Sequence, residues 1–516
     1  MKGLFRASNT TGEFWWLGYC IVLAGGLAVT YIARQHVTEP WLGLSLVLVL
    51  LLLLGWIIHP RATLTTTLFL TAVSDLSTVS WFPFLKNLSS RESISYVADA
   101  LSISPADIVL GVGAVIIVLR AHAEGGLVVP KHPLRWPIVV FAAFVGYGFV
   151  RGIVMRGGDL RIAVFEGRAL LYILLVFVIA LHVYTEPRHY RHGLFAILAG
   201  VFVQSLLSIE YLSGLDSAQR SELERLTEHG SALGQNLVML ALIGALLFAP
   251  RRPWLKTVLL IAAIPTVYVN LVGQRRAGMA TLMVAGVLFA ITLFWRRRRL
   301  FWATVPPVAV IALGYVAAFW NSSSALALPA RAVKSIVSPG SASARDQSSD
   351  LYRVVENYNL VFTIRAERFL GIGFGNPFYR PISLPDISFF EFNAYLPHNS
   401  ILWIWIKLGF GGFVALFYLL AKAILLGAER LRQVRDPVDF VVALCTTAFI
   451  VMFAAYSYVD ISWEARNTIF LAFALAYVGS PMQRRALEPP TSVAGRREST
   501  DDPETISDDA DSLVTT

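Results

Sequence analysis

The chain has 516 residues, 56% of them hydrophobic, with a mean hydropathy of +0.62 and a formal net charge of +9. Apolar runs of about 20 residues, long enough to cross a bilayer core, recur along the whole sequence. They are continuous rather than alternating, which excludes a transmembrane β-barrel as well as a soluble domain. The basic residues lie mostly in short connections between the runs, so we expect no nucleic-acid partner. The composition predicts a polytopic helical membrane protein.

The apolar runs predict about fourteen membrane spans. In chain order these are 14–33, 41–58, 62–82, 105–119, 134–150, 168–183, 193–213, 231–249, 254–272, 277–294, 301–320, 399–426, 438–458 and 462–479. The first run is too long for a signal-peptide core, so we interpret it as a retained span. Cys20 and Cys445 lie inside apolar runs, where they predict neither a disulfide framework nor a metal site.

Basic residues in the short connections orient the predicted spans. With the N-terminus in the cytoplasm, every connection on the cytoplasmic side carries Arg or Lys, as the positive-inside rule requires. These residues are Arg61, Arg120, Lys131, Arg135, Arg188, Arg191, Arg251, Arg252, Arg296 to Arg299, Arg430, Arg432 and Arg435. The same register places 151–168, 273–276 and 321–397 outside. The first two of these carry arginines on the disfavoured side, which an anionic ligand would explain.

Two segments differ from the spans in composition. The segment 321–397 is the longest polar connection, and residues 351–362 within it have apolar residues at helical spacing. We therefore expect helices lying over the outer mouth of the bundle. From Pro481 onward the chain lacks the apolar residues needed to fold, so 481–516 is predicted to be a disordered cytoplasmic tail after a transmembrane domain at 1–480.

A His-Asn pair stands where the long loop meets the twelfth span. His398-Asn399 is followed by nine residues and then by Gly409-x-x-Gly412. Taken alone, such a histidine is more often a helix-end residue, and the glycines let helices pack closely. The full spacing, however, arises by chance in roughly one such chain in a thousand. Because histidine titrates near neutral pH and can move a proton, His398 is the candidate catalytic residue.

The spacing resembles the signature of the O-antigen ligase and O-antigen polymerase superfamily, and Gly371 to Asn376 resembles the glycine-rich stretch before its histidine. The similarity covers roughly 130–480. It implies an all-α, GT-C-like transmembrane bundle with one large extracytoplasmic loop, in the cytoplasmic (inner) membrane. It also implies inverting glycan transfer on the outer face, from a polyprenyl-diphosphate donor such as undecaprenyl diphosphate to a glycan, lipid or protein acceptor. The histidine would assist the acceptor hydroxyl.

In this family outer-facing arginines are held to bind the donor diphosphate. Arg275 and Arg276 match the family's arginine at the start of a late span, although snorkelling at a helix end is the alternative. Arg353 resembles the loop arginine, with Arg345 as its rival. Arg168 is better interpreted as a membrane-interface anchor. Arginine forks bind phosphate bidentately and stay protonated, so Arg275, Arg276 and Arg353 are predicted to bind the substrate. Asn399, which would help to orient the site, is the fourth predicted substrate-binding residue.

The predicted early outer loop, 83–104, bears on metal use. It contains only Glu92 and Asp99 as acidic residues and no Asp-x-Asp. We therefore expect metal-independent chemistry without a cofactor. For Arg353, a surface salt bridge with Glu356 remains the alternative to phosphate binding.

Other functional classes remain open. A transporter or flippase of lipid-linked sugars would place ionisable residues at mid-membrane, whereas here charges concentrate at the outer boundary. Asp75 is the exception, and neighbouring Ser74, Ser77 and Thr78 can satisfy it. A scaffold would not require the motif and the arginines to converge. We favour the enzyme; ligase and polymerase differ only in their acceptor, so both remain.

Overall fold

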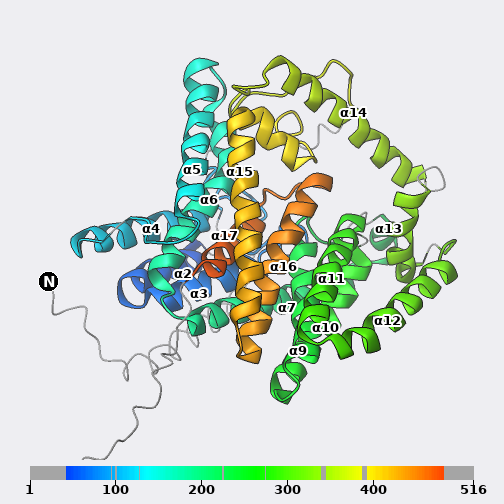
Figure 1. Cartoon of the computed structure of the whole chain (residues 1–516). Coiled ribbons are helices and arrows are strands. Elements are labelled where there is room, and N and C mark those ends of the chain that lie inside the picture. Colours follow the sequence, from blue (N-terminus) through cyan, green and yellow to red (C-terminus); the bar gives the residue numbers. More distant parts are fainter. Residues whose placement is uncertain are drawn as a thin grey trace, which may run out of the picture. The chain divides into compact units, whose positions relative to one another are not determined.

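The computed structural model describes residues 42–480, apart from 95, 99–100, 127, 223–225, 274, 323, 339–343 and 386–391. The predicted first span with Cys20, the residue Asp99 and the predicted tail lie outside the described residues, as does the Arg345 side chain. Within the described part all regular structure is helical (Figure 1). The predicted all-α class is confirmed.

The described helices follow the predicted spans closely. The first half contains α2 (Leu42–Ile58), α3 (Pro60–Val73), α4 (Pro105–Ala123), α5 (Arg135–Phe149), the π-helix η1 (Val150–Met155), α6 (Leu160–Val183), α7 (Pro187–Gly214), α8 (Ser217–Glu222) and α9 (Ser231–Phe248). The second half contains α10 (Pro253–Gly273), α11 (Arg276–Arg296), α12 (Arg298–Ala318), η2 (Ala325–Ala327), α13 (Leu328–Val337), α14 (Ala344–Ala366), α15 (Ser400–Gln433), α16 (Pro437–Val459) and α17 (Ala465–Val478). In the described ranges, 10 helices are long and apolar enough to cross a membrane. The total of fourteen spans stays a prediction.

The two largest differences from the predicted helix boundaries are at the end of α3 and the start of α6. α3 ends at Val73 rather than at residue 82, because Asp75 turns the chain by accepting the backbone N–H groups of Ser77 and Thr78, both at 3.0 Å. Asp75 therefore lies beyond the helix and not inside a span. α6 begins at Leu160 rather than at residue 168, where Asp159 caps it by accepting the N–H of Ile162 at 2.9 Å.

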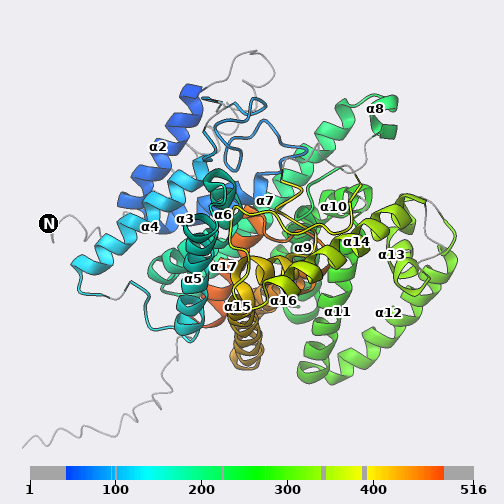
Figure 2. The same ribbon diagram turned by 90° about the horizontal axis from the view of Figure 1, so that it is seen from above.

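The core lies around the last two helices. α16 packs against α9, α11 and α15, while α17 packs against α6 and α16. In Figure 2 these two helices lie among the others, and almost every residue of α17 is buried. α12 is the opposite case, because none of its described residues is buried and its main contacts are α11 and α13. An apolar helix with so little protein contact is suited to a lipid environment.

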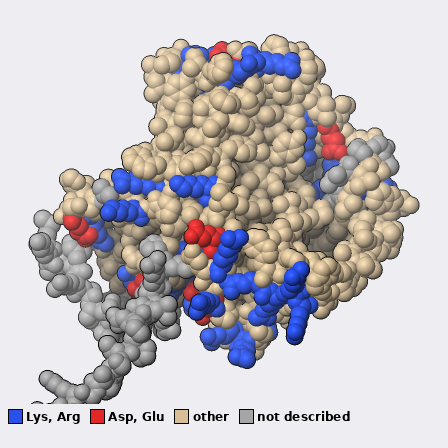
Figure 3. Space-filling model, viewed as in Figure 1, with Lys and Arg blue, Asp and Glu red and all other residues tan. Residues whose placement is uncertain are grey.

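Basic side chains gather at the end of the helices predicted to be cytoplasmic. Figure 3 shows them at the lower ends of α9 to α11 and α15, with a smaller group at the upper end near α5 and α15. Arg191, in the first turns of α7, pairs with Asp436 and Asp439 at the start of α16. The opposite end carries α14 and the junction that leads into α15. The assignment of this end to the outer face stays a prediction.

Candidate active site

A large cavity opens at the end of the helices that carries α14. Its volume is about 1230 Å³, and its lining includes residues from 83–104, 151–168, 273–276 and 321–397, which were all predicted to lie outside. Such a volume exceeds the roughly 300–1,000 Å³ of most small-molecule sites and suits an extended ligand. Of the predicted site residues, Arg275, Arg353 and His398 line this cavity, whereas Arg276 and Asn399 do not.

His398 is held at the start of α15 by a buried carboxylate. Its backbone N–H donates to Glu356 Oε2 at 2.9 Å, and its ring Nδ1 lies 3.2 Å from Glu356 Oε1. The Glu356 side chain is 2% exposed, compared with 23% for His398. A carboxylate at Nδ1 favours the tautomer that carries its proton there, which leaves Nε2 as a proton acceptor. The pair thus has the geometry of an oriented base.

Asn399 has a different position from the one expected. It is the N-cap residue of α15, where its side-chain oxygen accepts the N–H of Leu402 at 3.1 Å. Its amide nitrogen donates to Asn357 Oδ1 at 3.1 Å. Both contacts satisfy the residue within the protein, so Asn399 joins the start of α15 to α14.

Glu356 was missed as a partner of the histidine. The sequence suggested a surface pair with Arg353, but in the structure Arg353 Nη2 instead lies 3.8 Å from Asp460 Oδ2. One helical turn earlier, the ring of Tyr352 packs edge-on against His398 at 5.5 Å between centroids. Burial and the nearby Glu356 charge raise the pKa of Tyr352 to about 12. Tyr352 and Glu356 are four residues apart, which places them on the same face of a helix, and this spacing could have indicated that both face the histidine.

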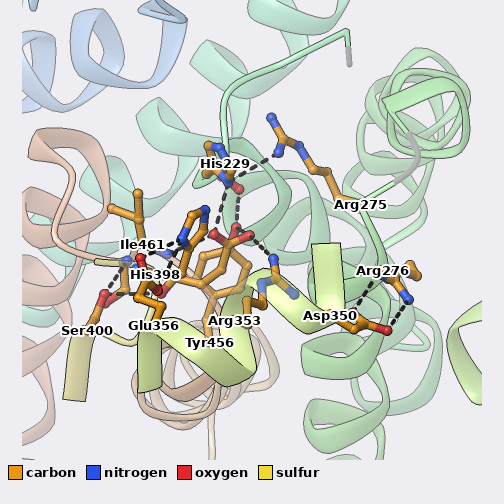
Figure 4. Close-up of polar contacts among 12 residues, drawn as sticks. His229, Arg275, Arg276, Asp350, Arg353, Glu356, His398, Ser400, Tyr456 and Ile461 are labelled. Atoms are coloured by element: carbon orange, nitrogen blue, oxygen red, sulfur yellow. Dashed lines mark hydrogen bonds and ion pairs between the residues drawn. The ribbon is translucent and has the colours of Figure 1, made fainter. Parts of the chain in front are cut away.

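Asp460, between α16 and α17, was also missed. Its carboxylate lies 2.9 Å from His229 Nδ1, and it accepts hydrogen bonds from the Ile461 N–H and the Tyr456 hydroxyl (Figure 4). Burial disfavours the charge on Asp460, but His229 and Arg353 together outweigh it and hold the pKa of this carboxyl well below its usual range. Asp460 therefore carries the negative charge that holds two cavity-lining groups in place.

The two adjacent arginines have different surroundings. Arg275 precedes α11 and is 9% exposed; its Nη1 lies 3.2 Å from His229 Nδ1, and its Nε has no partner among the described residues. The His229 ring lies 6.1 Å from the His398 ring, so one residue separates Arg275 from the proposed base. Arg276 forms a forked pair with Asp350 at 3.0 and 3.4 Å, away from both histidines (Figure 4).

A buried acidic group completes one wall of the cavity. Arg466 Nη2 lies 2.6 Å from Glu228 Oε2, and Glu464 accepts the N–H of Gly230 at 3.0 Å. Burial and carboxylate repulsion raise the pKa of Glu228 to about 7 and that of Glu464 to about 8. Asp75 lies behind this wall and accepts the Ser231 hydroxyl at 2.5 Å. In the sequence, the charged residues at 460, 464 and 466 stand close together at the start of the last apolar run, and this cluster could have indicated the group.

Other basic residues of the predicted outer segments have protein partners. Arg168 donates to Asn87 Oδ1 at 2.7 Å and lines the wall of the cavity formed by α6. Arg151 and Arg156 both pair with Glu367, at 3.4 and 2.6 Å, and so join η1 to the segment after α14. An anionic ligand is therefore not needed to explain these three arginines.

The glycines of the motif have a role that helix packing does not describe. Gly409 interrupts α15 with φ +69°, and a Cβ there would lie 2.2 Å from the Phe369 carbonyl oxygen. Gly373, with φ +71°, approaches the backbone of Gly152 equally closely. Both positions require glycine, because a side chain would be strained and would clash. The expectation that Gly409 packs against another helix is wrong. It packs against the backbone of Phe369 and Leu370, which leads into the loop at 371–376.

These features define a polytopic helical membrane protein in which a histidine–carboxylate pair and two arginines converge on one cavity. Residues 258–417 match the family model described as O-antigen ligase. This region begins in α10, ends in α15, and contains Arg275, Arg353 and His398. This match, over part of the chain, confirms the predicted resemblance to the superfamily and supports a glycan ligase or polymerase type of function. A comparison with curated proteins found no match.

Proposed function

We propose that this protein transfers a glycan from a polyprenyl-diphosphate donor to an acceptor hydroxyl, at the outer face of the cytoplasmic membrane. The observation that carries the proposal is the meeting of the His398–Glu356 pair with Arg275 and Arg353 in one cavity. A base and an anion-binding group are the two functions that such a displacement requires.

His398 acts as the base in this reaction. Its Nε2 takes the proton of the acceptor hydroxyl while the oxygen forms its bond to the anomeric carbon of the donor sugar. The bond from that carbon to the diphosphate oxygen breaks, and the polyprenyl diphosphate leaves as an anion. Glu356 stabilises the imidazolium that forms. A single displacement of this kind inverts the anomeric centre.

Arg275 and Arg353 neutralise the diphosphate. Guanidinium groups stay protonated and bind phosphate through two parallel N–H groups, so they supply this charge without a metal ion. Each such contact is worth about 1.5–3 kcal/mol. Arg276 and Asn399 serve the site indirectly, because they hold α14 through Asp350 and Asn357.

A transporter of lipid-linked sugars is the alternative, and the interruption of α15 at Gly409 also fits that class. Gly409 is not among the residues that line the cavity, however, because the chain around Phe369 and Gly371 packs against it. We therefore favour the transferase. Ligase and polymerase differ in the acceptor, and the glycoconjugate missing from a deletion strain identifies which one this is.

The test is glycan transfer by purified protein in proteoliposomes that contain a lipid-linked donor and an acceptor. His398→Ala should lower the rate by about 10²–10⁴, the usual contribution of a well-placed base. His122→Ala, an exposed histidine at the far end of α4, is the matched control and should leave the rate unchanged. Wild-type transfer by folded His398→Ala would overturn the proposal.

A further inference from the structure

We propose that the buried ion pair between Lys407 and Glu166 is the positioning element that aims His398 into the cavity. The inference rests on the proposed function, because it assigns to these two residues a role in the rate of that transfer. Neither residue is among the predicted site residues, and Lys407 does not line the cavity.

Both side chains of the pair are enclosed, and each is also hydrogen-bonded to the backbone. Lys407 Nζ lies 2.7 Å from Glu166 Oε1, and both side chains are 0% exposed. Nζ also donates to the Asn376 carbonyl at 2.5 Å, while Glu166 Oε2 accepts the Gly375 N–H at 2.6 Å. Two charges removed from water persist only where additional hydrogen bonds satisfy them, and here the backbone at 375–376 supplies those bonds. The pair thus ties α15, α6 and the glycine-rich loop together at one point.

The first part of α15 needs such an anchor because it is separate from the rest of the helix. The break at Gly409 leaves residues 400–408 as a short helix with its own direction. Near the break, the carbonyls of Ile406 and Lys407 accept the N–H groups of Ile372 and Gly373, at 2.6 and 3.2 Å. The direction of this short helix is therefore set by the loop at 371–376 and by the ion pair, not by the lower part of α15.

His398 lies two residues before this short helix, whose other end carries Lys407. At 1.5 Å per residue Ser400 and Lys407 are about 10 Å apart along the axis, so a tilt of about 5° at Lys407 moves the start of the helix, and His398 with it, by about 1 Å. A misplacement of that size can cost about 10²-fold in rate. An apolar contact would permit sliding, whereas the three polar contacts of the ion pair specify one arrangement.

The test replaces both charges at once, in the same transfer assay. Lys407→Met combined with Glu166→Gln keeps the volume and leaves no unpaired buried charge, so the protein should stay folded. We expect kcat to fall by about 10- to 100-fold while KM for the lipid-linked donor stays within about threefold. Lys407→Arg, which keeps the charge, should recover part of the lost kcat. A purely structural role would lower the amount of folded protein without this separation of kcat from KM.

The ion pair of Arg191 with Asp439 offers a matched control at the other end of the bundle. Arg191→Met with Asp439→Asn should change thermal stability but not kcat. A folded double variant of Lys407 and Glu166 with wild-type kcat would overturn the inference.

If that double variant does not fold, Glu166→Gln alone is measured in the same way, and failure of both to fold would also overturn it. If folded His398→Ala has the wild-type transfer rate, the proposed function itself is wrong. If His398→Ala is inactive but the double variant of Lys407 and Glu166 has the wild-type rate, the proposed function holds and only the role of the ion pair is wrong.

Discussion

Replacing Glu356 by glutamine removes the charge behind His398 while keeping the size of the side chain. Glu356 accepts two contacts from His398, one from the backbone N–H at 2.9 Å and one from ring Nδ1 at 3.2 Å. The single oxygen of glutamine can satisfy only one of them, and its NH₂ group would face the other donor. A hydrogen bond to a charged group is worth about 1.5–3 kcal/mol. At 1.36 kcal/mol per tenfold change, kcat should fall roughly 10- to 150-fold.

The assay is steady-state glycan transfer in proteoliposomes, with the donor and the acceptor varied in turn. KM for the donor should change little, because Arg275 and Arg353 keep their contacts with His229 and Asp460. Glu367→Gln is the control, because Glu367 lies directly after α14 and pairs with Arg151 and Arg156 rather than with His398. If folded Glu356→Gln keeps kcat within threefold of the wild type, Glu356 does not support the base.

Three further outcomes are expected. Arg275→Lys should raise KM for the donor about tenfold or more through loss of the phosphate fork, whereas Arg276→Lys should change it far less; equal effects in the transfer assay would contradict the assignment. Because burial raises the pKa of Glu228 to about 7 and of Glu464 to about 8, these two groups hold more protons in the folded protein than in the unfolded chain between about pH 4.5 and pH 8. Their contribution to the free energy of unfolding should therefore fall as pH rises through this range, and the difference in thermal unfolding between the wild type and the double Gln variant should change with pH accordingly. Gly409→Ala should destabilise the protein by about 1–3 kcal/mol in detergent unfolding experiments, because alanine is strained at φ +69° and its Cβ meets Phe369; an unchanged midpoint would contradict this.

The sequence predicted the parts of the fold that depend on local composition. The spans followed from apolar length, and residues 351–362 proved to be helical within α14. His398, Arg275 and Arg353 could be singled out because each stands at a polar boundary in a recognisable pattern. The early end of α3 was missed because its Ser-rich continuation at 74–82 still carries enough apolar residues to extend a span, and the turn made by Asp75 depends on side-chain hydrogen bonds.

The partners of these residues could not be predicted, because they come from distant parts of the chain. Glu356 and Asp460 face the histidines only once α14 and the α16–α17 junction meet at the cavity. Lys407 lies in an apolar run, where its charge gave no sign that it pairs with Glu166 in α6. The choice between Arg275 and Arg276 depends on the rotation of α11, which spacing alone does not fix.

The nine residues between Asn399 and Gly409 also set an angle. An α-helix turns about 100° per residue, so one residue inserted between 400 and 408 would rotate His398 by about that much relative to the break at Gly409. Glu356 would then face a different side of the helix, although every residue named in the site was still present. The number of residues in this interval is therefore as much a part of the site as their identity, which gives a physical reason for a motif defined by spacing.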